Sequence, residues 1–256
     1  MKTTLTDWVH VLGVRINNLS QAEAISLIES WILMAATTHS IYLVNAHTLN
    51  LSSDDAHFQA VLRNASRVFA DGTGVRWAAK MRGIKLKENL VGTDLIPRLF
   101  KETGGRGYRY YLLGASEDTI QRAAKKCQKD FPGWELAGCH HGFATALETP
   151  ALIERINEAR PHILLVGMGN PIQEQWIHRY QNQLRVPVCV GVGGLFDHWA
   201  GNIQRAPEWV RRRGFEWLQL LLQQPHKWRR YLLGNPKFLL RILKELPSDL
   251  ARSSQM

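Results

Sequence analysis

Short apolar runs alternate with helical patterns along most of the chain. Each run ends in a polar or glycine-rich turn, and the stretch that follows has the periodicity of an amphipathic helix. This alternation is typical of βαβ units, in which helices cover a parallel sheet. We therefore predict an α/β fold with a Rossmann-like parallel sheet and flanking helices. The apolar runs, with the turns that close them, are residues 41–46, 67–72, 108–116, 162–171 and 186–197.

Helical stretches are predicted over residues 47–65, 73–83, 117–131 and 172–184, with Ser116 as the N-cap of the third. Trp77 and Trp176 lie among apolar neighbours and are predicted to belong to the core. Ligands of parallel α/β sheets bind at the carboxyl ends of the strands. The segments that this rule selects are residues 45–47, 71–74, 114–116, 167–173 and 191–197.

The pattern changes after Gly201, where no further strand is predicted. Residues 205–256 show roughly two or three short amphipathic helices, with aromatic residues interleaved among arginines. We predict a core of residues 1–204 and a short basic helical appendage of residues 205–256. The residues expected to break its helices are Pro207, Gly214, Pro225, Gly234 and Pro236.

Most of the chain's net charge of +10 lies in this appendage. Between Arg205 and Lys244 there are ten basic and two acidic residues, which leaves +8. Such a patch attracts nucleic acid, acidic lipid or a phosphorylated substrate. Because basic helices edged with aromatic residues often lie on membranes, we expect an anionic membrane surface as a partner. The strongest candidates for this contact are Lys227, Arg229 and Arg230 around Trp228.

Several familiar catalytic and cofactor motifs are missing. The chain has no G-x-x-x-x-G-K-[ST], G-x-S-x-G or H-E-x-x-H motif, and neither residues 167–172 nor 191–196 complete G-x-G-x-x-G. It has no D-x-D pair to hold a metal against a nucleotide-sugar diphosphate, and the adjacent His140 and His141 are poorly spaced to share one ion. We therefore predict neither a metal nor a cofactor.

The composition, 45% hydrophobic and 21% charged, is that of an ordinary globular protein. The amino terminus lacks the pattern of a signal peptide, and no stretch approaches the roughly 20 apolar residues of a membrane-spanning helix. Three scattered cysteines without a C-x-x-C pair fit a reducing compartment. We expect a cytoplasmic protein, peripherally associated with the inner face of the plasma membrane.

Asp71 is the first candidate for chemistry, because it follows an apolar run in the sequence A-D-G-T-G. A carboxylate at the tip of a parallel strand is well placed to act as a general base. An aspartate before a glycine also commonly bonds its own backbone in a turn. The sequence position supports both interpretations equally. Asn45 and His47 follow the preceding run, although a lone histidine is more often structural than catalytic.

Two glycine-rich loops follow the last two apolar runs. Their glycines allow backbone N–H groups to approach a phosphate near the positive end of the next helix, but close strand–helix packing explains glycines there as well. Gln173 is predicted in the first turn of its helix, within reach of a substrate amide or hydroxyl. Asp197 either binds a sugar hydroxyl or caps a helix. The loop residues concerned are Gly167, Gly169, Asn170, Gly193 and Gly194.

Seven short sequence strings, taken in their order along the chain, resemble those of the WecG/TagA/CpsF family of bacterial glycosyltransferases. The resemblance runs from about Val11 to Tyr231. The chain departs from the family pattern at 45–47, at Asn89 and at Leu220. The matching strings are ADGTGV (70–75), VGTDL (91–95), LLGA (112–115), GMGNPIQEQWI (167–177), GVGGLFDHWAG (191–201), RAP (205–207) and FEWLQLLLQQPHKWRRY (215–231).

The resemblance implies a metal-independent, inverting transfer of N-acetylmannosamine or its uronic acid. The implied donor is a UDP-sugar, and the implied acceptor is a sugar on a polyprenyl diphosphate. Asp71 matches the family's proposed base, and Lys227 and Arg230 are expected to stabilise the leaving diphosphate. The full predicted substrate-binding set is Asn45, His47, Gly72, Thr93, Asp94, Gly114, Gly167, Gly169, Asn170, Gln173, Gly193, Gly194, Asp197, Arg205, Lys227 and Arg230.

Two other classes of protein remain as alternatives at this point. A nucleotide-cofactor oxidoreductase would use a similar sheet, and a nucleic-acid-binding protein would use the basic appendage. Neither is favoured, and no nucleic-acid partner is expected. The apolar face of the appendage also leaves open a homo-oligomer, in which a second copy takes the place of lipid.

Overall fold

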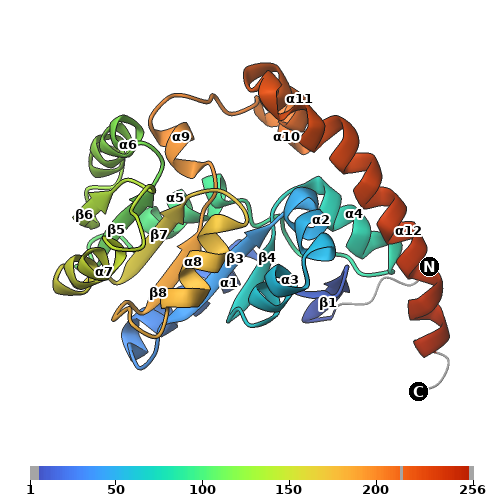
Figure 1. The fold of residues 1–256 in the computed structure, drawn as a ribbon, viewed down its shortest axis with the longest axis horizontal. Helices are drawn as coiled ribbons and strands as arrows, with labels where there is room; N and C mark the ends of the chain where they lie inside the picture. The colour runs from blue at the N-terminus through green and yellow to red at the C-terminus, as the bar shows by residue number, and fades with distance from the viewer. Residues whose placement is uncertain (1–5, 214–215, 254–256) are drawn as a thin grey trace.

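The computed structural model describes residues 6–213 and 216–253. At its centre lies a six-stranded sheet of order β4-β3-β8-β7-β5-β6, in which all neighbouring strands are parallel. Helices cover both faces (Figure 1), which confirms the predicted fold class. The strands are β3 (His39–Val44), β4 (Arg67–Ala70), β5 (Arg109–Gly114), β6 (Glu135–His140), β7 (Ile163–Gly167) and β8 (Val188–Gly191).

Three strands were not predicted from the sequence. The edge strand β6 has the sequence ELAGCH and no buried residue, so it lacks the apolar run by which the other sheet strands are recognised. The other two, β1 (Trp8–Val11) and β2 (Val14–Asn17), form an antiparallel hairpin outside the main sheet. Each is only four residues long and buries alternate positions, which is a weak signal at that length.

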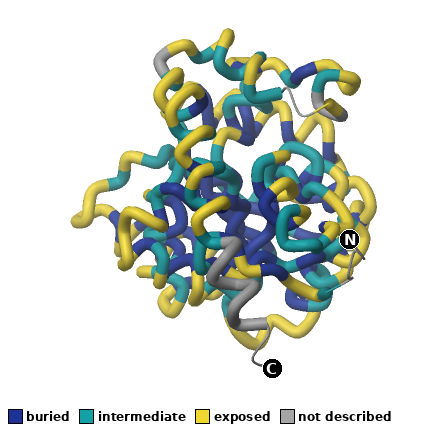
Figure 2. The backbone as a smooth tube through the Cα atoms, turned by 90° about the vertical axis from the view of Figure 1, so that its right-hand side faces the viewer, coloured by how far each residue is buried: buried dark blue, intermediate teal, exposed yellow. Residues whose placement is uncertain are grey.

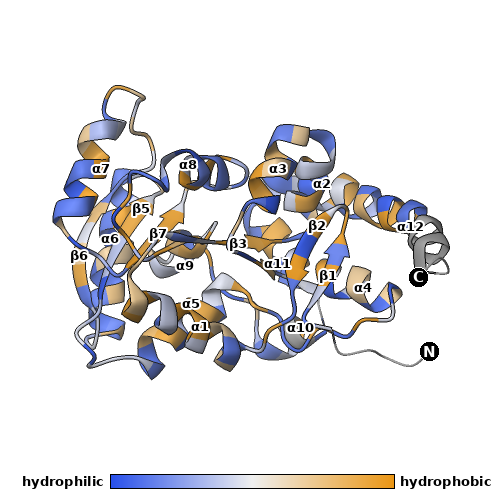
Figure 3. Ribbon diagram, turned by 90° about the horizontal axis from the view of Figure 1, so that it is seen from below, coloured by the Kyte–Doolittle hydropathy of each residue, from blue (hydrophilic) through white to orange (hydrophobic). Residues whose placement is uncertain are grey.

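The helices form two apolar layers, one against each face of the sheet. Phe58 and Ile177 belong to one buried cluster, whereas Ile28 and Phe100 belong to the other. Figure 3 shows α7 and α8 on the side of the sheet opposite to α1 and α5, and Figure 2 shows the buried interior between them. The first layer contains α2 (Ala46–Asp54), α3 (Ala56–Arg63), α4 (Thr73–Met81), α7 (Thr149–Glu158) and α8 (Ile172–Tyr180); the second contains α1 (Gln21–Met34), α5 (Gly92–Glu102), α6 (Glu117–Asp130) and α9 (Leu195–Trp199).

Local signals account for most helix boundaries. Ser116 caps α6 as predicted, with its hydroxyl accepting from the N–H of Thr119. The single helix predicted over 47–65 is two helices, because Asp55 leaves the helical conformation and its carboxylate caps α3. The prediction for Trp77 is wrong, since this side chain on α4 is 57% exposed. Trp176 packs against the first apolar layer.

The carboxyl-terminal segment, residues 205–253, is helical throughout much of its length. In Figure 1, α10 and α11 lie at the top of the molecule and α12 runs down its right-hand side, past α2 and α4. The expectation of short helices is wrong for α12, because Gly234 and Pro236 fall in its first turn, where a proline is tolerated. The elements are α10 (Glu208–Arg212), α11 (Glu216–Gln223), η1 (Pro225–Lys227), η2 (Arg229–Leu233) and α12 (Gly234–Ser253).

Helix α12 is fixed to the core by both apolar and charged contacts. Phe238 and Ile242 are buried in the first apolar layer. Lys237 and Arg241 form ion pairs with Asp54 at the end of α2. Part of the appendage's positive charge is therefore neutralised within the protein. Among the described residues, no helix is both long and apolar enough to cross a membrane.

Candidate active site

The carboxyl ends of β3 and β4 bring two predicted site residues together. Val44 and Ala70 are paired in the sheet, so the residues that follow them, Asn45 and Asp71, begin neighbouring turns. The N–H of Asp71 donates to the carbonyl of Val44 at 2.8 Å. The Asn45 side chain caps α2 by accepting from the N–H of His47 at 3.0 Å. This cap orients the first turn of α2, which carries His47.

The turn that holds Asp71 is fixed by Asn89, a position where the sequence departs from the family pattern. Asn89 Oδ1 accepts from the N–H of Gly72 at 2.7 Å, and the next N–H, that of Leu90, donates to Ala70. Gly72 has φ +103°, a conformation that favours glycine. Nothing lies within 4 Å of where its Cβ would stand, so the turn is open on that side.

Both positive and negative charges act on Asp71. Its side chain is partly buried, and its pKa is raised to about 6, chiefly by desolvation. The carboxylates of Glu216 and Asp94 contribute to this rise, while Arg230 and Arg205 oppose it. A carboxylate with such a pKa is still ionised at neutral pH but attracts a proton more strongly than an ordinary aspartate. These properties suit a general base.

Cationic groups from the carboxyl-terminal segment face α2 and α9. Burial lowers the pKa of His47 to about 4, with the positive charges of Arg230 and Lys227 adding to the effect. The imidazole is therefore neutral at physiological pH. Burial and Arg230 also lower the pKa of Lys227, whereas Asp197 raises it. Lys227 and Arg230 thus share one neighbourhood with His47, as the sequence predicts for a diphosphate site.

The glycines of the predicted site divide into two groups. A Cβ at Gly114 would lie 2.2 Å from the carbonyl oxygen of Gly167, and one at Gly167 would lie 2.6 Å from the Phe196 ring. These two glycines are required for packing, the alternative that the sequence left open. Nothing lies within 4 Å of a Cβ built at Gly169, Gly193 or Gly194. This second group, like Gly72, has space for a ligand to approach the backbone.

Gln173 is buried and holds the loop of Gly193 and Gly194 through a hydrogen bond. It is 1% exposed, its Oε1 accepts from the N–H of Gly193 at 3.0 Å, and its Nε2 donates to Glu174 Oε1 at 2.8 Å. Asn170, which precedes the cis proline Pro171, donates to the same Glu174 oxygen. In this arrangement the Gln173 amide is engaged by the protein at both ends.

Glu174 was missed by the sequence analysis. Its side chain is fully buried, and burial raises its pKa to about 7. Its oxygen Oε2 has no hydrogen-bond partner. Acidic residues are common in the first turn of a helix, so nothing in the sequence pattern indicates that this one is buried.

Four further predicted residues, which include Asp94, lie at the margins of this region. Thr93 is in the first turn of α5, next to Asp94. Asp197 is part of α9 and is not its cap; its carboxylate accepts from Asn202 at 3.0 Å. Arg205 is paired with Asp94 on the core and with Glu216 on α11.

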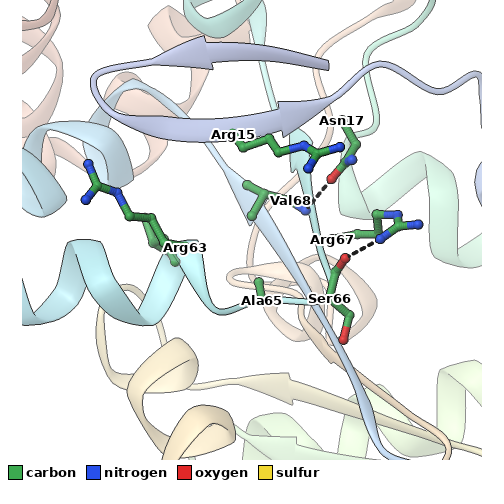
Figure 4. A pocket seen from close by; sticks show the side chains of 8 residues that line it. Arg15, Asn17, Arg63, Ala65, Ser66, Arg67 and Val68 are labelled. Carbon is green, nitrogen blue, oxygen red and sulfur yellow. Dashed lines mark hydrogen bonds between the residues drawn. The ribbon is translucent and has the colours of Figure 1, made fainter. Parts of the chain in front are cut away.

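A separate hollow of about 110 Å³ lies at the opposite end of β4. Figure 4 shows that the guanidinium of Arg63 points away from those of Arg15 and Arg67. Arg67 donates to the carbonyl of Ser66, and Asn17 accepts from the N–H of Val68. These groups do not converge on a ligand, so we assign no site to this hollow.

The Rossmann-like sheet carries a carboxylate of raised pKa at its carboxyl edge, where cations of the carboxyl-terminal segment act on it, and this arrangement suits an α/β group-transfer enzyme. The sequence matches the Glycosyl transferase WecG/TagA/CpsF family over residues 9–251. The chain therefore belongs to this family and is a glycosyltransferase, which sets aside the oxidoreductase alternative.

Similar relatives share one name, N-acetylglucosaminyldiphosphoundecaprenol N-acetyl-beta-D-mannosaminyltransferase. That of Bacillus spizizenii (strain ATCC 23059 / NRRL B-14472 / W23) is 34% identical over 187 residues, which cover 73% of this chain and 72% of the relative. That of Bacillus subtilis (strain 168) is 30% identical over 205 residues, or 80% and 79%. That of Staphylococcus aureus (strain MW2) is 30% identical over 240 residues, or 92% of each.

Proposed function

We propose that this glycosyltransferase moves N-acetylmannosamine, or its uronic acid, from a UDP donor to a sugar on a polyprenyl diphosphate. The observation that carries the proposal is Asp71, a carboxylate of raised pKa in an open turn, with Arg230 within its electrostatic range. The names of the relatives, which specify an N-acetylmannosaminyl group and a diphosphoundecaprenol-linked sugar, support this choice of substrates. The product belongs to cell-surface polysaccharide synthesis.

In the proposed reaction Asp71 accepts the proton of the acceptor hydroxyl. The acceptor oxygen attacks the anomeric carbon of the donor sugar from the face opposite the diphosphate. As the new carbon–oxygen bond forms, the bond to UDP breaks and its electron pair leaves with the diphosphate, so the anomeric configuration is inverted. Asp71 holds one proton at the end of the cycle and returns it to solvent.

Stabilisation of the leaving diphosphate is assigned to the chain's own cations. Lys227 and Arg230 belong to the carboxyl-terminal segment and act on the same neighbourhood as His47. Because His47 is neutral, the positive charge available to the diphosphate comes from Lys227 and Arg230. The open backbone at Gly169 and Gly194 offers N–H groups for the phosphate oxygens, whereas the N–H of Gly193 is held by Gln173. With these groups in place, we propose that the transfer needs no bound metal.

The acceptor's lipid places the reaction at a membrane. On the outer side of the carboxyl-terminal segment, the described residues of η2 and α12 include four exposed leucines, and Lys244 lies beside them. We propose that this surface rests on anionic lipid at the inner face of the plasma membrane, while Phe238 and Ile242 hold the segment to the core. A second copy of the chain is the competing occupant. The exposed leucines are Leu232, Leu233, Leu240 and Leu243.

Acceptor-dependent release of UDP tests the proposed function. The purified full-length chain is supplied with a panel of UDP-sugars and a GlcNAc-diphosphate-lipid acceptor, with and without EDTA. We expect release with the N-acetylmannosamine-type donor only when acceptor is present, and an unchanged rate in EDTA. Release from no donor in the panel would refute the proposed substrates, and loss of the rate in EDTA would refute metal independence.

A further inference from the structure

Arg205 stands at the junction between the core and the carboxyl-terminal segment. Its Nη1 and Nη2 donate to the two carboxylate oxygens of Asp94 at 2.7 and 3.2 Å, and its Nε donates to Glu216 Oε1 at 3.2 Å. Asp94 belongs to α5 of the core, whereas Glu216 begins α11. One guanidinium therefore joins these two parts of the chain.

The geometry leaves Arg205 little capacity for a ligand. A bidentate pair with a carboxylate uses both terminal nitrogens of the guanidinium in a planar fork, and here Nε is occupied as well. The side chain is also partly buried. Its pairing with two carboxylates on different elements is the arrangement of a structural link, in contrast to the substrate-binding role expected from the sequence.

This link lies in the electrostatic environment of Asp71. The charged groups that act on Asp71 are Glu216 on α11, Asp94 on α5, Arg205 itself and Arg230 on η2. Burial raises the pKa of Tyr231, also on η2; Arg230 opposes this rise, and the charges of Asp71 and Glu216 add to it. Two of the three members of the link are acidic, so the link as a whole brings net negative charge towards Asp71.

We propose that Asp94, Arg205 and Glu216 form a positioning clamp, which docks α11 on the core and holds Glu216 within electrostatic range of Asp71 during transfer. This inference rests on the proposed function, in which Asp71 accepts the proton. Its consequence is that the strength of the base depends on the docked position of the carboxyl-terminal segment. The clamp residues touch no substrate in this account and act through Asp71.

The pH dependence of kcat/KM for the acceptor tests the clamp. Asp71 must be ionised to act, so activity rises with pH through its pKa, about 6 in the docked protein. Glu216→Gln keeps an oxygen for Arg205 but removes a negative charge that raises this pKa. We expect the acidic midpoint to move down by about 0.5–1 pH unit. Asp94→Asn moves it in the same direction, and Glu216→Asp leaves it near the wild-type value.

Glu245→Gln is the matched control. Glu245 pairs with Arg82, accepts from the N–H of Leu12 and so anchors α12; the variant therefore removes one negative charge from the same segment without touching the charges around Asp71. We expect no change in its midpoint. Thermal unfolding of each variant identifies those that fold. If Glu216→Gln fails to fold, Asp94→Asn provides the test.

The outcomes separate the clamp from the proposed function. If Glu216→Gln and Asp94→Asn lower the rate equally at every pH and leave the midpoint in place, the clamp is purely structural and the inference is wrong. If the wild-type protein shows no acceptor-dependent release of UDP, the proposed function fails and the inference with it. A wild-type rate that depends on Asp71, together with lowered midpoints in both variants, supports both.

Discussion

At the scale of single residues, the structure separates glycines that serve packing from glycines that leave room for a ligand. Gly114 has φ +147° and abuts the backbone of Gly167, whereas Gly194 has φ −80° and open space beside its Cα. Both stand at the carboxyl ends of strands, where the sequence predicts a ligand-binding turn, so this position alone does not distinguish them. The distinction depends on which neighbouring strand supplies the opposing atoms.

Alanine substitutions at these two positions are therefore expected to differ in kind. Gly114→Ala forces a Cβ against backbone in a strained conformation and should destabilise the fold by about 3 kcal/mol or more. Gly194→Ala should leave the unfolding midpoint almost unchanged and weaken binding of the UDP donor by roughly tenfold, since the methyl group fills the approach to the backbone. Denaturant unfolding and calorimetric titration measure the two effects. Normal donor affinity in Gly194→Ala would contradict a phosphate-binding role for this loop.

The residues of the candidate site were predictable from the sequence only in part. Asp71, His47, Lys227 and Arg230 were predicted as site residues, and the structure places them together at one edge of the sheet. Glu216 was not among them, because its only relevance is its proximity to Asp71. That proximity arises when residues 145 positions apart in the chain come together, and no local pattern records it.

At the scale of elements, the strands with apolar runs were predictable and the edge strand β6 was not. A buried parallel strand needs apolar residues on both faces, which produces a continuous run. An edge strand such as β6 has solvent on part of its surface, so its sequence resembles a loop. Helix α12 was predicted as short helices, because Gly234 and Pro236 were expected to break them; both lie in its first turn, where a proline is tolerated.

The docking of α12 depends mainly on its apolar face. Ile242 is fully buried, whereas the ion pairs of Asp54 lie at a surface where its side chain is 49% exposed. We expect Ile242→Ala to cost about 2–4 kcal/mol of unfolding free energy and Asp54→Asn less than about 1 kcal/mol. Urea denaturation followed by circular dichroism compares them. A larger loss in Asp54→Asn would show that charge, and not burial, holds the helix.

At the scale of the whole molecule, the carboxyl-terminal segment has two sides with different tasks. Its inner side supplies Glu216, Lys227 and Arg230 to the carboxyl edge of the sheet, and its outer side exposes leucines beside lysine. In the proposed function the acceptor is linked to a lipid, so one segment with both tasks would place the catalytic charges as it docks on the membrane.

Binding to vesicles tests the outer side. Replacement of Leu232 and Leu240 by serine should reduce flotation with vesicles that contain anionic lipid by roughly tenfold, because both exposed apolar side chains are lost. Leu33→Ser is the control, since this leucine on α1 is 70% exposed but lies outside the segment. If the double variant floats like the wild type but changes its oligomeric state in light scattering, a second copy of the chain is the occupant of this surface.

The central claim is that Asp71 removes the acceptor proton, and the rate of acceptor-dependent UDP release by Asp71→Asn tests it most directly. Asparagine preserves the shape of the side chain but cannot accept the proton. We predict a rate reduced by about 10²–10⁴-fold, with donor affinity and thermal stability close to those of the wild type. A rate within about threefold of the wild type would show that another group is the base.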